Sequence, residues 1–75
     1  MHARLAFSLA ELCGKHNCKI LVGNGDQWAD GKDMAGLLGL ALGPGDKVEL
    51  SADGENAQEA LDELLLFFNT RGKSL

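Results

Sequence analysis

Apolar residues recur at helical spacing near the start of the chain, between polar positions. Successive members of this stripe lie three or four positions apart or side by side, which predicts an amphipathic helix over about residues 3–13. Gly14 then supplies a stop signal. Phe7 falls outside the stripe, so we expect an exposed ring. The stripe consists of Leu5, Ala6, Leu9, Ala10, Leu12 and Cys13.

The middle of the chain has the pattern of a β-hairpin followed by a short helix. Residues 18–22 are mostly apolar and predict a strand, the Asn-Gly pair at 24–25 is a hairpin signal, and residues 26–30 are expected to return antiparallel. Asp33 precedes the apolar run 34–40 and suits the N-cap of a short helix, which two glycines weaken.

The last third predicts a turn, a strand and a long helix. Residues 43–46 form a glycine- and proline-rich turn, and residues 47–52 alternate polar and apolar, as in a strand with one wet face. Asn56 and Glu59 resemble a capping box, and residues 70–75 are polar and expected to fray. The apolar stripe of the final helix is Ala57, Ala60, Leu61, Leu64, Leu65 and Phe68.

The order helix, strand, strand, helix, strand, helix predicts an α+β fold. We expect an open-faced β-sandwich, in which three helices cover one face of a small antiparallel sheet. Residues 1–75 are too few for more than one small domain, so any functional site should lie on the surface.

The charge balance excludes several partner classes. Eleven acidic residues against seven basic ones give a net charge of -4, and the lysines are scattered, so we expect no nucleic-acid or anionic-membrane partner. The longest apolar run, residues 64–68, is far shorter than the ~20 residues that cross a bilayer. With no leader pattern at its start, the chain is predicted to be cytoplasmic.

Cys13, His16 and Cys18 lie close together in sequence and raise the question of a metal site. Structural zinc normally requires four ligands at recognisable spacing, and only three candidates are present here. The alternative is that Cys13 continues the helix stripe and Cys18 opens a strand. We therefore predict no metal, no cofactor and no disulfide.

Three short segments resemble the histidine-containing phosphocarrier (HPr) family of the bacterial phosphoenolpyruvate-dependent sugar phosphotransferase system. They are His2-Ala3-Arg4 before the first helix, Gly31-Lys32-Asp33-Met34 before the short helix, and Gly45-Asp46 followed by the strand that leads to Gly54-Glu55. The resemblance covers essentially the whole chain, with these segments in register. It implies a carrier, and no free-standing enzyme, that accepts a phosphoryl group from enzyme I and passes it to enzyme IIA domains.

The resemblance also implies the site residues. His2 matches the phosphorylated histidine and Arg4 the arginine that neutralises the phosphate, with the helix start at Ala3 and Arg4 stabilising the group. The chemistry agrees, because an imidazole nitrogen is a nucleophile and a helix N-terminus favours an anion. Arg4 adds a guanidinium that can bind phosphate oxygens bidentately.

A docking surface follows from the same resemblance. Phe7, Met34, Ala35 and Leu38 match positions that meet enzyme I and enzyme IIA in the family. The alternative for Met34 and Leu38 is a place in the core, which is our preferred interpretation for Leu37.

The chain departs from the family at three places. Leu5 replaces the usual proline, which leaves the first helical turn less restrained. Asp33 stands where many members carry a regulatory serine, so phosphorylation by the serine kinase is not expected. The family's first strand, which pairs with the segment Lys47–Ala52, is absent, and we interpret Met1 as an internal methionine read as a start. The exposed Lys47–Ala52 edge then predicts one of two outcomes, either self-association through this edge or a marginal stability that rises when the upstream strand is restored.

Two other functions stay open. A regulatory, nitrogen-related phosphocarrier would share the same residues. A truncated adaptor domain that is never phosphorylated is favoured if the missing strand is real.

Overall fold

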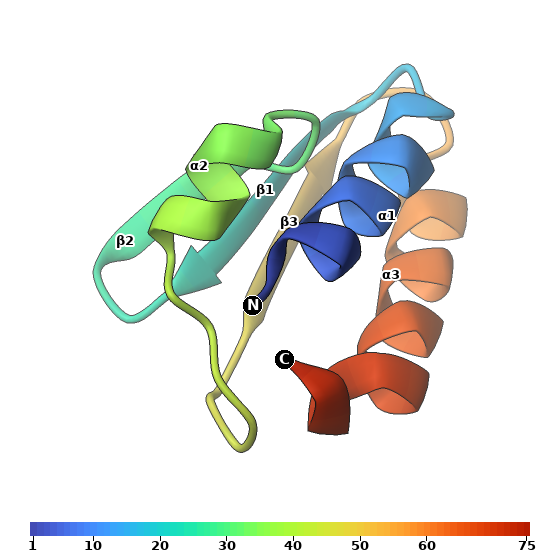
Figure 1. Ribbon diagram of the computed structural model, residues 1–75. Coiled ribbons are helices and arrows are strands. Elements are labelled where there is room, and N and C mark those ends of the chain that lie inside the picture. Colours follow the sequence, from blue (N-terminus) through green and yellow to red (C-terminus); the bar gives the residue numbers. More distant parts are fainter.

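The computed structural model describes residues 1–75 and confirms the α+β open-faced sandwich, with the helices on one face of an antiparallel sheet (Figure 1). None of the helices is both long and apolar enough to span a membrane. The elements are α1 (Ala3–Gly14), β1 (Lys19–Asn24), β2 (Gln27–Asp30), α2 (Met34–Gly39), β3 (Glu49–Asp53), α3 (Ala57–Arg71) and a closing 3₁₀ turn, η1 (Gly72–Ser74).

The sheet has the strand order β2-β1-β3, so β1 is central and β3 lies at an edge. Val22 of β1 pairs with Ala29 on one side and with Leu50 on the other. Ile20 and Val22 are fully buried beneath the helices, as the alternation of strand side chains requires. The core thus joins the inner face of β1 to one face of each helix. Its largest fully buried members are Leu9, Ile20, Leu37, Leu42, Leu64 and Val22.

The hairpin turn lies one residue later than the sequence pattern predicted. Asn24 pairs with Gln27 as the last strand pair, so Gly25 and Asp26 form the loop. Gly25 has a φ of 65°, which glycine adopts without strain. Asn24 therefore belongs to the strand and not to the turn, and its side chain is available for a hydrogen bond outside the hairpin.

Of the two predicted helix caps, the position of Asp33 is confirmed and the capping box at Asn56 is wrong. Asp33 occupies the N-cap position of α2, but its side chain makes no cap hydrogen bond and is exposed. Asn56 precedes α3 in the left-handed region (φ 59°, ψ 30°), where the capping box with Glu59 does not form. A capping box needs extended backbone at the N-cap, so the left-handed conformation directs the amide of Asn56 away.

The predicted stripe of the last helix is partly wrong. Leu65, assigned to the stripe, is 52% exposed, whereas Phe67, left out of it, is only 8% exposed. The buried positions of α3 are Ala60, Leu64 and Phe67. This narrow stripe fits a helix that meets the core along one line at the side of the sheet.

The chain end is helical where fraying was predicted. α3 continues to Arg71, and η1 extends to Ser74. The guanidinium of Arg71 lies 5.4 Å from the centre of the Phe67 ring, a cation–π contact. Leu75 is partly buried and packs against the core.

Ala41, in the loop after α2, has a φ of 53°, a left-handed conformation that costs a residue with a Cβ about 1–2 kcal/mol. Ala41→Gly should therefore raise the free energy of unfolding by roughly 0.5–1 kcal/mol, after the greater freedom of the unfolded chain is allowed for. Urea denaturation followed by circular dichroism measures the change. Ala35→Gly, within α2, is the control and should destabilise by a similar amount.

Candidate functional site

His2 is the residue on which α1 begins. It takes the N-cap position in extended backbone (φ -86°, ψ 169°), and its carbonyl oxygen accepts the first helical bond from the N–H of Ala6 at 3.1 Å. The imidazole makes no cap hydrogen bond and is exposed. The helix therefore holds the backbone of His2 while its ring nitrogens face solvent.

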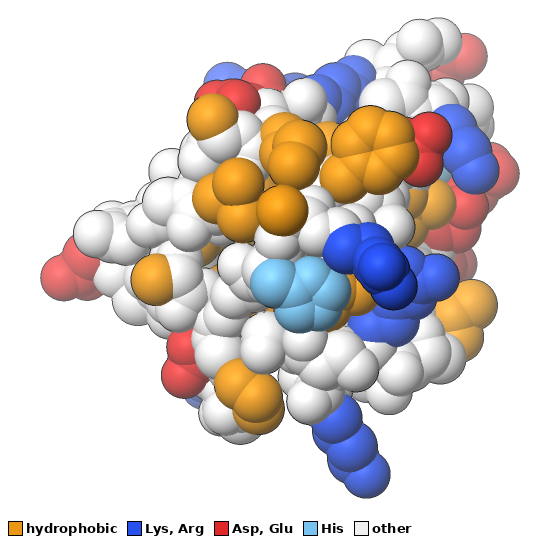
Figure 2. All heavy atoms as spheres, in the orientation of Figure 1, with side chains coloured by type: hydrophobic (Ala, Val, Ile, Leu, Met, Phe, Trp, Pro, Cys, Tyr) orange, Lys and Arg blue, Asp and Glu red, His pale blue; other side chains and the backbone are white.

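The start of α1 has the chemistry of an anion-binding site. The N–H groups of Ala3, Arg4 and Leu5 precede the first helical bond and have no carbonyl partner within the helix. No acidic side chain lies in the first turn to compete for them. The Arg4 side chain is exposed in the same turn, and Figure 2 shows a histidine with Lys or Arg side chains beside it. The positive end of the helix dipole and a guanidinium thus favour a negative group at this point.

Leu5 contributes packing rather than flexibility. It is only 4% exposed and belongs to the core cluster. The buried side chain of Leu5 therefore anchors the first turn of α1 to the core, and the looser backbone expected without proline stays a prediction.

Two contacts that sequence reasoning missed tie the site to the loop after α2. The amino nitrogen of Met1 donates to the carbonyl oxygen of Leu42. The Asn24 side-chain amide donates to the carbonyl oxygen of Leu40 at 2.9 Å. The first contact joins the residue before His2 to the loop after α2, and the second joins the end of β1 to the same loop. No sequence signal could have shown these contacts, because in the sequence Asn24 has the pattern of a turn residue.

An apolar patch accompanies the helix starts. Phe7 is 53% and Leu38 is 37% exposed, and Ala35 is also at the surface. Met34 is half-buried and packs against the core, whereas Leu37 is fully buried, as predicted. Hydrophobic side chains gather on this face beside the histidine (Figure 2). Such an arrangement of an apolar patch around a charged centre suits transient protein contacts.

The two cysteine side chains lie in the core. Cys13 and Cys18 are free and buried. Burial, together with the charge of Asp30, raises the pKa of the Cys13 thiol to about 11. Cys13 is consequently protonated at neutral pH, the form in which a thiol is a weak nucleophile.

His16 serves a different purpose from His2. Its Nε2 lies 2.7 Å from a carboxylate oxygen of Glu63, close enough for an ion pair when the ring is protonated, although not aligned as a hydrogen bond. Its backbone carbonyl accepts from the Lys32 ammonium at 2.7 Å. These contacts fasten the loop between α1 and β1 to α3 and to the loop after β2, so His16 is not available as a surface nucleophile.

Comparisons with known proteins agree with this geometry. A family model described as the PTS HPr component phosphorylation site matches residues 1–70. The phosphocarrier protein HPr of Pseudomonas aeruginosa is 35% identical over 72 residues, which cover 95% of this chain and 80% of that one. The phosphocarrier protein NPr of Shewanella violacea is 34% identical over 64 residues, or 85% of this chain and 70% of that one.

A solved structure extends the likeness to the fold. The catabolite repression containing protein Crh of Bacillus subtilis, itself a swapped dimer, superposes with a TM-score of 0.88 at 27% identity, covering 93% of this chain and 80% of that one. Sequence model, relatives and fold agree over nearly the whole chain. The chain therefore belongs to the HPr family of phosphocarrier components of the phosphotransferase system.

Proposed function

We propose that this chain carries a phosphoryl group on His2, taking it from phosphorylated enzyme I and passing it to enzyme IIA domains in phosphoenolpyruvate-dependent sugar uptake. The observation that carries the proposal is the exposed imidazole at a helix start with free N–H groups and an adjacent arginine. The imidazole supplies the nucleophile, and the N–H groups and the arginine can bind the phosphate that the imidazole carries after transfer.

The transfer needs only the groups present at this site. The lone pair of a neutral ring nitrogen forms an N–P bond while the bond between phosphorus and the donor breaks, and the electron pair of that bond leaves with the donor. The return step runs the same exchange with the acceptor as nucleophile. Nothing is oxidised or reduced, and the phosphoryl group arrives already activated.

The strength of phosphate binding must be moderate for a carrier. Ala3 and Arg4 are exposed, so water screens the attraction of the helix start for the phosphate. A buried cage would hold the group too tightly to release it. The open site therefore suits transfer in both directions.

Partner binding is assigned to the patch of Phe7, Met34, Ala35 and Leu38. Two partners that use one surface in turn must each dissociate quickly, and a small apolar patch gives weak, short-lived contacts. Asp33 at the start of α2 already carries one negative charge and has no hydroxyl group to phosphorylate. We place the exchange in the cytoplasm, where enzyme I and its phosphoenolpyruvate are found.

The test is incubation with enzyme I, magnesium and phosphoenolpyruvate, followed by intact-mass spectrometry. The chain should gain the mass of a single phosphoryl group, and mild acid should remove it, as expected of a phosphohistidine. Addition of an enzyme IIA domain should return the carrier to its starting mass. A modification that survives acid, or no modification at all, would refute the proposal.

The similarity to NPr of Shewanella violacea favours one alternative, a regulatory phosphocarrier of the nitrogen-related branch. The two functions differ in the donor. Parallel reactions with enzyme I of the sugar system and with its nitrogen-related counterpart would separate them, since the faster phosphorylation identifies the physiological partner.

Arg4→Ala should slow phosphoryl transfer roughly 10- to 100-fold, because a charge-assisted contact to the phosphate is worth about 1.5–3 kcal/mol. Arg4→Lys should recover part of the rate, since it keeps the charge and loses the bidentate geometry. Quench-flow measurement of transfer from enzyme I gives both values. Arg71→Ala, which removes a surface arginine on α3, is the control and should transfer at the normal rate; an equal loss there would show that general charge, not the site, is responsible.

A further inference from the structure

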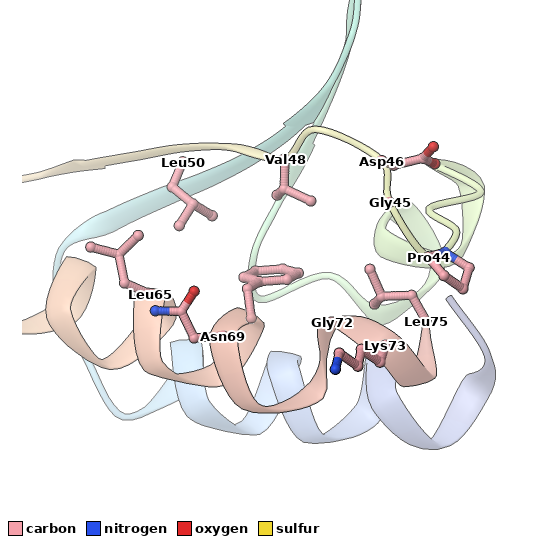
Figure 3. A pocket seen from close by; sticks show the side chains of 11 residues that line it. Pro44, Gly45, Asp46, Val48, Leu50, Leu65, Asn69, Gly72, Lys73 and Leu75 are labelled. Carbon is pink, nitrogen blue, oxygen red and sulfur yellow. The ribbon is translucent and has the colours of Figure 1, made fainter.

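The sheet has an outer face, the one that the helices leave uncovered. Leu50 of β3 points toward α3 (Figure 3), so its neighbour Glu49 points to the outer face. On β2, Ala29 is buried, whereas Trp28 and Asp30 on either side of it are exposed. By the same alternation, the odd-numbered residues of β1 and β3 and the even-numbered residues of β2 share the outer face.

The indole of Trp28 lies flat on this outer face, across Gly23 of β1. Gly23 is the register partner of Trp28, and a Cβ atom built on Gly23 would lie 2.9 Å from three adjacent carbon atoms of the indole. Gly23 is accordingly buried although no helix covers it, while Trp28 is 47% exposed. One face of the ring therefore rests on the glycine, and the other face is open to solvent.

Carboxylates flank the open face of the indole. Glu49 is the next residue in the same row across the sheet, and Asp30 lies two residues along β2 on the same face. Neither carboxylate forms an ion pair in the structure. Lys19, the only basic residue of the three strands, is the register partner of Asp53, two rows away from Trp28. The negative charge beside the indole is therefore not neutralised within the sheet.

An open aromatic face between carboxylates has the chemistry of a cation site. The π-electrons of an indole attract a cation above the ring, and a carboxylate at the rim pairs with the same cation. Arginine suits this combination better than lysine, because its planar guanidinium stacks on the ring and can bind a carboxylate through two N–H groups. Two outer faces of this chain would bring like charges together, which disfavours a second copy as the occupant.

We propose that the outer face binds an arginine-bearing segment of a partner protein, with the guanidinium stacked on Trp28 between the carboxylates of Glu49 and Asp30. The contact also gives Gly23 a role, because a larger residue there would lift the indole from the sheet. The site lies on the other side of the sheet from α1 and His2. It does not rest on the phosphocarrier function.

The test titrates the full chain with the peptide acetyl-Ser-Arg-Gly-Arg-Ser-amide. The matched control is the same peptide with citrulline in place of both arginines, since citrulline keeps the planar end group and removes the charge. Trp28 is the single tryptophan, so its fluorescence reports directly on the site. The arginine peptide should shift this fluorescence with a Kd on the order of 1 mM, and the citrulline peptide should bind at least roughly fivefold more weakly.

Glu49→Gln tests the carboxylate without disturbing the ring. It should weaken binding of the arginine peptide roughly two- to fivefold, because one exposed ion pair is lost. Glu59→Gln is the matched control, since it makes the same charge change at an exposed position of α3, on the helical side of the sheet. It should leave the affinity unchanged.

Trp28→Leu tests the ring itself and should abolish the binding of the arginine peptide. Nuclear magnetic resonance titration measures this variant, which has no tryptophan fluorescence, and circular dichroism verifies that it is folded. If Trp28→Leu does not fold, the citrulline peptide and the two glutamate variants still decide the question.

Four results would overturn the proposal. They are a failure of the arginine peptide to bind, equal binding of the citrulline peptide, equal effects of the two glutamate variants, and binding that persists in a folded Trp28→Leu variant. Sedimentation of the chain without peptide adds a fifth, because a dimer that Trp28→Leu dissociates would assign the outer face to a second copy instead.

Discussion

His2→Ala is expected to abolish phosphoryl uptake from enzyme I completely, leaving the intact mass unchanged after incubation with phosphoenolpyruvate. The reason is chemical, since no other nucleophilic side chain lies at the unblocked start of a helix beside an arginine. The His2 side chain is exposed and makes no cap hydrogen bond, so alanine should change the free energy of unfolding by less than about 0.5 kcal/mol and the loss would not reflect unfolding.

His16→Ala is the matched control for this experiment. Its ring is nearly buried against Glu63, and its removal should leave phosphorylation intact while costing some stability. If His16→Ala lost phosphorylation in a folded protein, or His2→Ala kept it, the assignment of the acceptor would be wrong. Together, the two variants show whether phosphorylation requires the imidazole at position 2 or can use any imidazole in the chain.

Leu64→Ala should lower the free energy of unfolding by about 2–5 kcal/mol. The side chain is fully buried, so truncation loses its transfer free energy and leaves a cavity. A domain of this size is expected to have a total stability of only about 4–11 kcal/mol, so much of the protein would be unfolded in mild denaturant. Urea titration followed by far-ultraviolet circular dichroism measures the change.

Leu66→Ala is the control two positions along the same helix. Leu66 is 63% exposed, and its truncation should alter stability by less than about 0.5 kcal/mol. A similar loss in both variants would mean that α3 packs on the sheet by a different face from the one observed.

The local geometry of the candidate site was predictable because its residues are adjacent in sequence. His2, Ala3 and Arg4 form the beginning of one helix, and their local geometry follows from helix structure alone. The contacts of Met1 with Leu42 and of Asn24 with Leu40 were not predictable. They join segments far apart in the chain. Every residue has a backbone carbonyl, so the sequence does not show which donor a given carbonyl will bind.

The sequence by itself determined the order and type of the elements, because hydrophobic period and turn residues act over a few neighbouring positions. It also determined that Leu37 is buried and Phe7 exposed, since each follows from the phase of its helix. Only the tertiary structure decided which face of α3 meets the core and how its ends are capped. Those features depend on where the helix lies against the sheet: at its side, α3 buries Phe67 and leaves Leu65 over the open edge of β3.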